Sequence, residues 1–530
     1  MINIKTSYSR FIASILAVIM LVIFFNINSI TAKAANYYVD SKTGSDTNSG
    51  LSVTSPWKSF KNINSKTFQP GDEILLKSGS VWNEQLMPQG NGNQTEPITI
   101  SKYGGELKPR INGNGTHNYK RNSGTVMLVN QHDWIIKNLE VTNYSSTIQS
   151  QRSGILIINN SNTTQNNITV ADNYVHDVNS DTQEHGAWKV TGGIILIGIN
   201  EDLDGKINSN KNFGFDNVLV KNNHVDNVSI AGIRNKSTLL NTNGSESYPK
   251  NNKNITYENN DVENVYGDGM IISEVSDNGI VKNNKVNKFC NTESRFNYAG
   301  LWVMASDNTT VENNEVSNGL YGNNDGTAFD IDLSCNNVVV QHNYSHDNAR
   351  GSVLFMNASH NGIFRYNVCI NDGWNPNSKM ISYLPSTTTE KAYVYNNLFI
   401  ASPTTANLIK CSGNRRYLDF TNNLVISQNP NMVTFNQGTM TGELNFKNNA
   451  VYGFNSQWFG KDNISLKDED TVKQLIADNA KVSGIANLNL KSLANLPELK
   501  KAGIFEGTGL TDFNDQPVAN IPSIGPVELK

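Results

Sequence analysis

The stretch "NNVVVQHNYSHDN", residues 336–348, contains the pattern that decides the fold. Apolar and polar residues alternate on both sides of a polar pair that ends at Asn343. Alternation with a period of two is typical of a half-buried β-strand. The same pattern recurs along the chain, and the asparagines at its reference position are Asn173, Asn223, Asn260, Asn284, Asn314, Asn343, Asn367, Asn397, Asn423 and Asn449. From Asn260 onward they are spaced 24 to 30 residues apart.

A repeat of this length predicts a solenoid. Each unit contains short strands and no helical stripe, so it cannot bury an apolar face alone and must stack on its neighbours. We therefore predict an all-β parallel β-helix of about ten or more coils. Stacking would place the reference asparagines above one another, where each amide can donate and accept along the column. Asparagine also tolerates the left-handed backbone of tight turns, so we assign no chemistry to these positions.

A second strand recurs just before the repeated pattern. It begins with a glycine each time, at Gly154, Gly193, Gly232, Gly269, Gly300, Gly326 and Gly351. The loops that lead into this strand differ in length and are rich in charged and aromatic residues. Irregular loops on one side of a regular solenoid mark its binding face, so we expect the functional site there.

The ends of the chain depart from the repeat. Lys5 and Arg10 precede an apolar run, residues 11–25, and Ala32-Lys33-Ala34 fits a small-residue cleavage site, so residues 1–34 are predicted to be a signal peptide. The run is short for a membrane span of roughly 20 residues. We expect a secreted, extracellular protein without membrane contact after cleavage. Residues 35–115 are predicted to form an N-terminal lead-in cap, 116–460 the β-helix repeats, and 461–530 an irregular, partly helix-like C-terminal capping tail.

The composition excludes some partners and motifs. The formal net charge of −4 gives no sign of a nucleic-acid surface, and we expect a monomer whose partner is a polysaccharide or oligosaccharide substrate. The four cysteines, Cys290, Cys335, Cys369 and Cys411, lack the CxxC spacing of zinc or redox motifs. We expect them to be free and buried in the core.

Several of these stretches resemble a known family. "YYVDSKTGSDTNSGL" (37–51) and "FQPGDEILLKSGSVW" (68–82) resemble the opening of secreted bacterial right-handed β-helix proteins of the pectate-lyase-like superfamily. "GTAFDIDLSCNNVVVQHNYSHDNARG" (326–351) is similar to a segment of their glycoside-hydrolase branch, which includes the fucosidase/xylanase-type family and, more distantly, β-xylosidases. The resemblance implies a right-handed parallel β-helix and a polysaccharide-degrading glycoside hydrolase acting on plant or microbial glycans. One departure is Asn357, which stands where the β-xylosidase branch has an acid.

Two aspartates in the segment 326–351 are the first catalytic candidates. If Phe329 and Ile331 point inward, alternation sends Asp330 and Asp332 outward, about 6.5 to 7 Å apart. Two adjacent carboxylates can divide the acid and base roles that hydrolysis of a glycosidic bond requires. The alternative interpretation is that they only solvate the strand or hold Ca²⁺. Further catalytic candidates are Asp325, Asp268, His346 and Asp347, although His346-Asp347 also recurs as His176-Asp177 and can equally be a feature of the turns.

Substrate-binding candidates lie in the loops. Arg350 is suited to a sugar carboxylate, and Trp188, Tyr266, Tyr298, Tyr321 and Trp374 are candidate stacking platforms for sugar rings. Arg234 and Lys236 interrupt an otherwise apolar strand. They keep a second function open, a Ca²⁺-dependent pectate-type lyase in which Arg234, Lys236 or Arg350 supplies the base. The hydrolase requires no cofactor, whereas the lyase would use Ca²⁺, and a third alternative is a non-catalytic carbohydrate-binding surface protein.

Overall fold

The computed structural model describes most of the chain after its N-terminal segment. The described residues are 34–115, 123–147, 151–182, 191–203, 205–208, 213–241, 246–291, 297–320, 325–376, 378–386, 390–411, 416–435, 442–454 and 462–530. The predicted signal peptide therefore lies outside them, apart from Ala34. Within these ranges, no helix is both long enough and apolar enough to cross a membrane.

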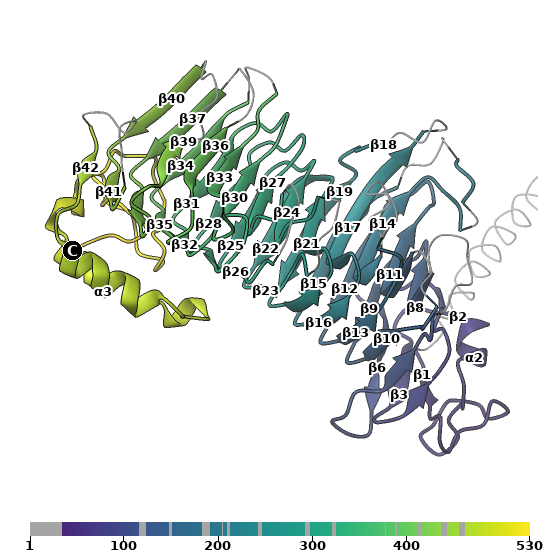
Figure 1. Ribbon diagram of the computed structural model, residues 1–530. Coiled ribbons are helices and arrows are strands. Elements are labelled where there is room, and N and C mark those ends of the chain that lie inside the picture. Colours follow the sequence, from purple (N-terminus) through teal and green to yellow (C-terminus); the bar gives the residue numbers. More distant parts are fainter. Residues whose placement is uncertain are drawn as a thin grey trace, which may run out of the picture.

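Three long parallel sheets wind around one axis and confirm the predicted parallel β-helix (Figure 1). Sheet I contains β1 (Asn36–Val39), β3 (Glu73–Lys77), β6 (Ile98–Tyr103), β9 (Trp134–Lys137), β12 (Gln165–Ala171), β15 (Phe215–Lys221), β19 (Asn252–Glu258), β22 (Val275–Lys282), β25 (Thr309–Glu312), β28 (Val339–Gln341), β31 (Gly362–Arg365), β34 (Ala392–Tyr395), β37 (Arg416–Thr421) and β40 (Gly442–Lys447). Sheet II contains β4 (Val81–Trp82), β7 (Arg110–Asn112), β10 (Glu140–Asn143), β13 (Tyr174–Val178), β16 (His224–Val228), β20 (Asp261–Val265), β23 (Lys285–Asn287), β26 (Glu315–Ser317), β29 (Tyr344–His346), β32 (Val368–Ile370), β35 (Leu398–Ala401), β38 (Leu424–Ser427), β41 (Ala450–Tyr452) and β42 (Ile464–Ser465).

Sheet III carries the strands that contain the recurring glycines or begin within three residues after them. It contains β8 (Ser123–Val129), β11 (Arg152–Asn159), β14 (Gly192–Ile199), β17 (Ala231–Leu240), β21 (Asp268–Ser273), β24 (Leu301–Met304), β27 (Phe329–Ile331), β30 (Val353–Phe355), β33 (Lys379–Tyr383), β36 (Asn407–Cys411) and β39 (Val433–Phe435), with β18 (Glu246–Ser247) antiparallel to β17. Two short strands, β2 (Thr67–Phe68) and β5 (Gln89–Gly90), and helix α2 (Lys61–Asn64) belong to the N-terminal region. The inward faces of sheets I, II and III enclose one continuous apolar core, in which all four cysteines are buried and free, as predicted.

The reference asparagines form a continuous column inside the solenoid, as predicted. In each step the Nδ2 group and the backbone N–H of one asparagine both donate to Oδ1 of the next; for Asn314 and Asn343 these distances are 3.0 and 2.9 Å. The column runs unbroken from Asn173 to Asn449 and ends on Asn463. Because both partners of each bond are buried, the column satisfies polar groups that would otherwise destabilise the core.

The residue before each reference asparagine has a left-handed backbone. It is an asparagine in most coils, with φ between 52° and 57° at Asn222, Asn259, Asn283, Asn313, Asn396, Asn422 and Asn448. Asparagine adopts this conformation more readily than most residues, which explains why the repeat contains a pair of asparagines. The first asparagine of the pair therefore makes the turn between sheets I and II, and the second makes the column.

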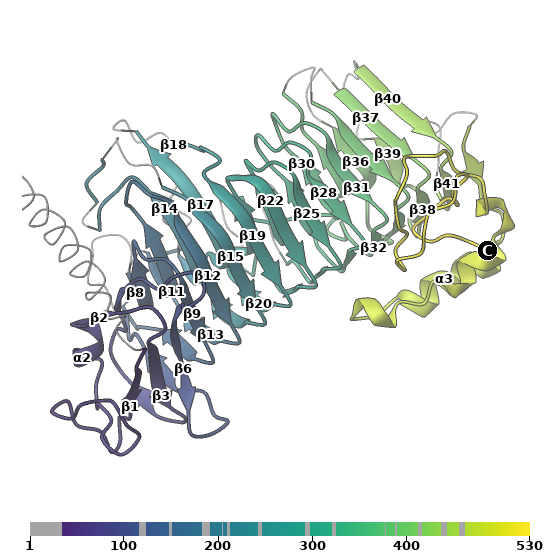
Figure 2. The same ribbon diagram turned by 180° about the vertical axis from the view of Figure 1, so that it is seen from behind.

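The C-terminal segment packs along the side of the last coils (Figure 2). Helix α3 (Glu469–Asn479) and the 3₁₀ turns Ile485–Asn487, Lys491–Asn495 and Pro497–Leu499 cover the outward side chains of sheet II. Val472 and Leu475 of α3 belong to one buried cluster with Leu398 and Leu424. Asp468 caps α3 by accepting the Thr471 N–H at 3.0 Å. The outer face of sheet II is therefore apolar and covered in this half of the molecule.

Candidate active site

The candidate site lies on the outer face of sheet III. Phe329 and Ile331 belong to the inner core, so the alternation in β27 turns Asp330 outward, and Asp332 follows two residues later, as predicted. The neighbouring coils place Trp302 and Leu354 beside Asp330 in register. The aspartates thus stand between apolar side chains of the two adjacent coils, and a need for solubility alone does not explain them there.

The column that contains Asp330 can be followed along the sheet. Its members, in order of coils, are Arg234, Ile271, Trp302, Asp330, Leu354, Ser382 and Lys410. Arg234 precedes Asp330 by three coils and Lys410 follows it by three. Since strands of adjacent coils are about 4.8 Å apart, each cation lies roughly 14 Å from Asp330 along the axis. Acidic and basic groups therefore alternate along one face on the scale of an oligosaccharide.

The three aspartates of this coil differ in how far they are buried. Both carboxylate oxygens of Asp330 are buried, and the residue is 1% exposed. Asp332 and Asp325 retain 4% and 7% exposure. The backbone of Asp332 is held on both sides, because its N–H donates to the Val303 carbonyl at 2.9 Å and its carbonyl accepts Ser359 Oγ at 2.5 Å. Asp325 and Asp332 are thus the acids of this coil that are the more accessible to a ligand.

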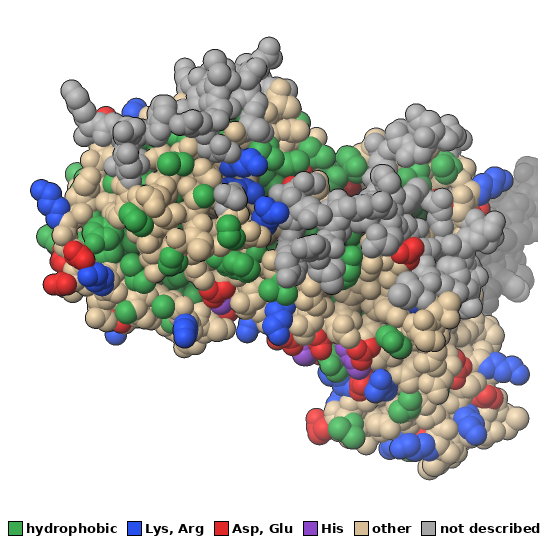
Figure 3. Space-filling view, viewed as in Figure 1, with side chains coloured by type: hydrophobic (Ala, Val, Ile, Leu, Met, Phe, Trp, Pro, Cys, Tyr) green, Lys and Arg blue, Asp and Glu red, His purple; other side chains and the backbone are tan. Residues whose placement is uncertain are grey.

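The charge of Asp325 acts on a lysine that the sequence analysis did not single out. Lys379 begins β33, two coils after β27, and is only 6% exposed. Burial, together with the positive charges of Arg350 and Lys410, lowers the pKa of Lys379 to about 8, while the charge of Asp325 acts in the opposite direction. Figure 3 shows Lys and Arg side chains gathered over β30, β33 and β36. The signal in the sequence was a lysine at the start of a strand of sheet III that lacks the usual leading glycine.

Arg234 and Lys236 lie on the same outer face, on β17. Both are almost completely buried. Glu274, at the end of the next coil, is also buried, and its Oε2 accepts the Ser237 N–H at 3.1 Å. Burial raises the pKa of Glu274, and the charges of Lys236 and Arg234 oppose that shift. These two cations therefore face an acid of the neighbouring coil.

Asp268 and the described aromatic candidates make contacts within the protein that account for their positions. Asp268 is fully buried at the start of β21, where its Oδ1 accepts the Ala299 N–H at 2.9 Å and so joins two coils. Tyr298 is 2% exposed and meets Tyr266 edge to face at 6.3 Å. Trp374 donates its Nε1–H to the Asp347 carbonyl at 2.9 Å, which directs it to the sheet II side. Trp188 and Tyr321 lie outside the described residues.

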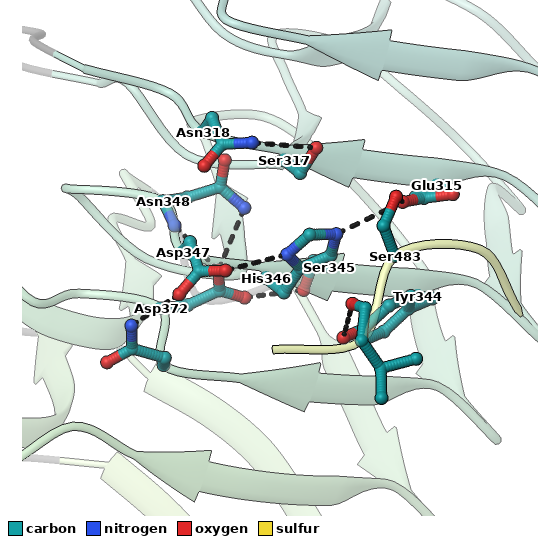
Figure 4. Close-up of polar contacts among 12 residues, drawn as sticks. Glu315, Ser317, Asn318, Tyr344, Ser345, His346, Asp347, Asn348, Asp372 and Ser483 are labelled. Carbon is teal, nitrogen blue, oxygen red and sulfur yellow. Dashed lines mark hydrogen bonds and ion pairs between the residues drawn. The ribbon is translucent and has the colours of Figure 1, made fainter. Parts of the chain in front are cut away.

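His346 ends β29 in sheet II, and Asp347 follows it (Figure 4). His346 contacts Asp347 through Nδ1 at 2.8 Å and Glu315 through Nε2 at 3.1 Å. The His346 ring is buried, but hydrogen bonds and charges from the two acids raise its pKa to about 9, so the ring is protonated at neutral pH. We call these three residues the Glu315 cluster.

The Glu315 cluster holds the C-terminal segment. Glu315 Oε1 also accepts Ser483 Oγ at 3.1 Å and the Gly484 N–H at 3.0 Å, as Figure 4 shows for Ser483. Tyr344 stacks on His346 at 4.5 Å, and its hydroxyl donates to the Val482 carbonyl at 2.8 Å. Since β29 belongs to sheet II and β27 to sheet III, the structure does not bring His346 and Asp347 together with Asp325, Asp330 and Asp332.

The same arrangement occurs in an earlier coil. His176 contacts Asp177 at 2.8 Å and Glu140 of the preceding coil at 3.1 Å, and Tyr174 stacks on it at 4.1 Å. We call Glu140, His176 and Asp177 the Glu140 cluster. The recurrence favours the interpretation of His346-Asp347 as a feature of the repeat. Within the described ranges, no group of three or more His, Cys, Asp or Glu side chains is arranged to hold a metal ion.

Known proteins share both sequence and fold with this chain. No family model matches it. It is 27% identical over 504 residues to a lacto-N-biosidase of Bifidobacterium longum subsp. longum, a match that covers 80% of this chain and 31% of the relative. The chain therefore spans about a third of the length of the curated relative it matches.

Two solved structures share its fold. A GH136 lacto-N-biosidase from Eubacterium ramulus superposes with a TM-score of 0.56 at 23% identity, over 73% of this chain and 68% of that one. XylC, solved in complex with xylose, superposes with a TM-score of 0.52 at 12% identity, over 94% and 98% of the two chains. These likenesses support the parallel β-helix fold.

Proposed function

We propose that the protein is a glycoside hydrolase that acts on glycans, of the same type as the lacto-N-biosidase to which it is similar in sequence. The observation that carries the proposal is the group of aspartates on the outer face of sheet III, where the two adjacent coils place the apolar Trp302 and Leu354 beside Asp330. Sequence similarity over 80% of the chain supports the same reaction class. The partner is accordingly an oligosaccharide or polysaccharide.

The two more accessible acids take the chemical roles. Glycoside hydrolysis uses one carboxylic acid to protonate the leaving oxygen and a second carboxylate as nucleophile or as base for water. We assign these roles to Asp325 and Asp332 because they retain exposure, whereas the oxygens of Asp330 are buried. Asp330 lies beside them on the same face, but its carboxylate oxygens are buried and take no direct part in the reaction. This mechanism needs no metal ion or other cofactor.

The test uses the purified protein with an aryl lacto-N-bioside, xylan, pectin and fucosylated glycans, with and without EDTA. We expect new reducing ends, no absorbance of unsaturated sugars and no effect of EDTA. Asp325→Asn and Asp332→Asn should each lose this activity, whereas Asp177→Asn, which removes an acid from sheet II, should keep it. Binding of glycans without any cleavage would instead indicate a carbohydrate-binding surface protein.

A second candidate function is a polysaccharide lyase, and Lys379 is the observation that favours it. A lysine with a pKa of about 8 is suited to remove the proton beside a uronate carboxylate. Arg350, whose charge acts on Lys379, could neutralise that carboxylate, with Ca²⁺ as an additional ligand in such an enzyme. Absorbance of unsaturated products that is lost in Lys379→Met would establish this reaction and remove the hydrolase.

Secretion is part of the proposal. The charged and apolar pattern of residues 1–34 supports export, and a glycan substrate fits an extracellular location. Mass spectrometry of the protein from culture medium would test this, since cleavage after Ala34 should yield a chain that begins at Ala35.

A further inference from the structure

Three cations lie on the three coils of sheet III that follow the coil of the proposed catalytic acids. Arg350 lies three residues before the start of β30, Lys379 begins β33, and Lys410 lies on β36. The charges of the other two cations and of Asp325 all act on Lys379. The charge of Lys379 is therefore opposed by two other cations, and Asp325 is the acid whose charge favours it.

Lys379 has an environment that is unusual for a lysine. Lys379 is only 6% exposed. Among the described residues, its ammonium group makes no hydrogen bond or ion pair within the usual distances. Lysine is rarely buried without a partner, because removing its charge from water is costly. A ligand that brings a negative group to Lys379 would offset this cost.

The backbones of two neighbouring coils pack closely beside Lys379. Gly351 is the neighbour of Lys379 in the preceding coil, and its φ of 140° is a conformation that glycine adopts readily. A Cβ atom at this position would lie only 2.4 Å from the Lys379 carbonyl oxygen, so a larger residue would not fit. The residue beside Lys379 in the preceding coil therefore has no side chain. Asp325 lies two coils away, roughly 10 Å along the axis at about 4.8 Å per coil. This is the scale of neighbouring sugar units in one glycan.

We infer that Lys379, Arg350 and Lys410 form a subsite for an anionic sugar, a ring that bears a carboxylate or a sulfate, beside the acids that cleave the glycan. Arginine can bind a carboxylate or sulfate through two parallel hydrogen bonds, while lysine supplies a point charge with three donors. Burial strengthens the attraction, because the effective dielectric constant is lower than in water. The inference rests on the proposed function, since it takes Asp325 and Asp332 as the reacting acids.

Binding of an anion at this subsite should be coupled to protonation of Lys379. Because the pKa of Lys379 is about 8, part of the population is neutral at pH 8.5, and a bound anion favours the charged form. The charged groups that act on Lys379 are Arg350 before β30, Lys410 on β36 and Asp325 before β27. Binding of an anionic sugar at pH 8.5 should therefore take up protons, whereas a neutral sugar should not.

The experiment measures binding and hydrolysis separately. Calorimetry on the full-length Asp332→Asn protein compares a neutral oligosaccharide of the lacto-N type with its sialylated and its sulfated derivatives, which distinguishes a carboxylate from a sulfate as the preferred anion. We expect tighter binding of at least one anionic derivative. Lys379→Met should weaken that binding about 10- to 100-fold and abolish proton uptake, Lys379→Arg should restore the binding, and Lys447→Met, an exposed lysine of β40, should change neither.

Each result has one meaning. Equal affinity for the three glycans, or equal losses for all three in Lys379→Met, would overturn the subsite. If the wild-type protein hydrolyses the neutral glycan but shows no preference for an anion, the proposed function stands and the subsite fails. If it hydrolyses none of them while the preference for an anion depends on Lys379, the subsite stands and the proposed function fails.

Discussion

Two outer faces of the solenoid carry charged clusters, and they are built differently. On sheet II the Glu315 cluster is internally paired, since His346 contacts an acid through each ring nitrogen and Glu315 binds the tail. The Glu140 cluster repeats the same contacts in another coil. On sheet III the aspartates of β27 recur in no neighbouring coil, where Trp302 and Leu354 take the place of Asp330. We interpret the charge that recurs with the coil as part of the architecture, and we propose chemistry for the aspartates that occur in one coil alone.

The largest expected effect is a loss of activity that a substitution on sheet III causes and one on sheet II does not. Asp332→Asn should lower kcat/KM about 100- to 10,000-fold, because one of the two carboxyl groups that exchange protons or charge with the substrate is lost. The rate is measured with an aryl lacto-N-bioside, and the melting temperature checks that the fold is kept. The matched control is Asp177→Asn of the Glu140 cluster. A comparable loss of activity in this control would mean that sheet II takes part in the reaction.

The second effect is on stability and should appear only on sheet II. Glu315→Gln removes the negative charge beside the protonated His346 and weakens the acceptor of the Ser483 and Gly484 contacts. Breaking a buried ion pair by removing one partner costs about 3 kcal/mol or more. We expect faster proteolysis of the segment around residues 482–484 at unchanged kcat/KM. If kcat falls while proteolysis stays the same, the Glu315 cluster would have a catalytic role after all.

The third effect depends on pH. The pKa of His346 is about 9 in the folded protein, above its usual value of 6.5. Its contribution to stability is therefore fully present below pH 6.5 and is lost as the pH rises through about 9. The pKa values of Glu315 and Asp347 are lowered by His346 and by hydrogen bonds, so their contribution is lost in the opposite direction, as the pH falls below their usual values.

Hydrogen exchange of residues 482–484, corrected for intrinsic rates, measures this directly. Protection should decrease between pH 6.5 and 9 in the wild-type protein. In His346→Gln it should be low at both values and independent of pH in this range. Equal pH dependence in the two proteins would assign the effect to another group.

The smallest effect concerns the Glu140 cluster. His176→Gln removes the same central imidazole as His346→Gln, but Glu140 and Asp177 have side chains that are 25% and 45% exposed. Ion pairs at such exposure contribute about 1 kcal/mol or less. Urea unfolding should therefore shift much less than for His346→Gln. Similar shifts would show that the tail adds nothing to the cluster it covers.

The fold could be predicted from the sequence at the level of single residues. Alternation with a period of two determines which side chains face the core, and the asparagine pair determines where each coil turns, so the Asn column and the outward direction of Asp330 were both predicted. The site was predicted less completely. His346 follows Asp330 by only 16 residues, but a coil has three faces, and this distance carries the chain from sheet III to sheet II. Lys379 was missed because its burial depends on neighbouring coils and not on its own strand.

The asparagine column has a consequence for the history of such chains. Each asparagine of the column donates through its Nδ2 and backbone N–H to the next coil and accepts the same two groups from the preceding coil through Oδ1, so the contacts are identical from coil to coil. If one whole coil is deleted or duplicated, the flanking amides meet with the contacts they had before. The length of the solenoid can therefore change by whole coils without penalty at its centre, and the loops on sheet III can be gained, lost or exchanged one at a time.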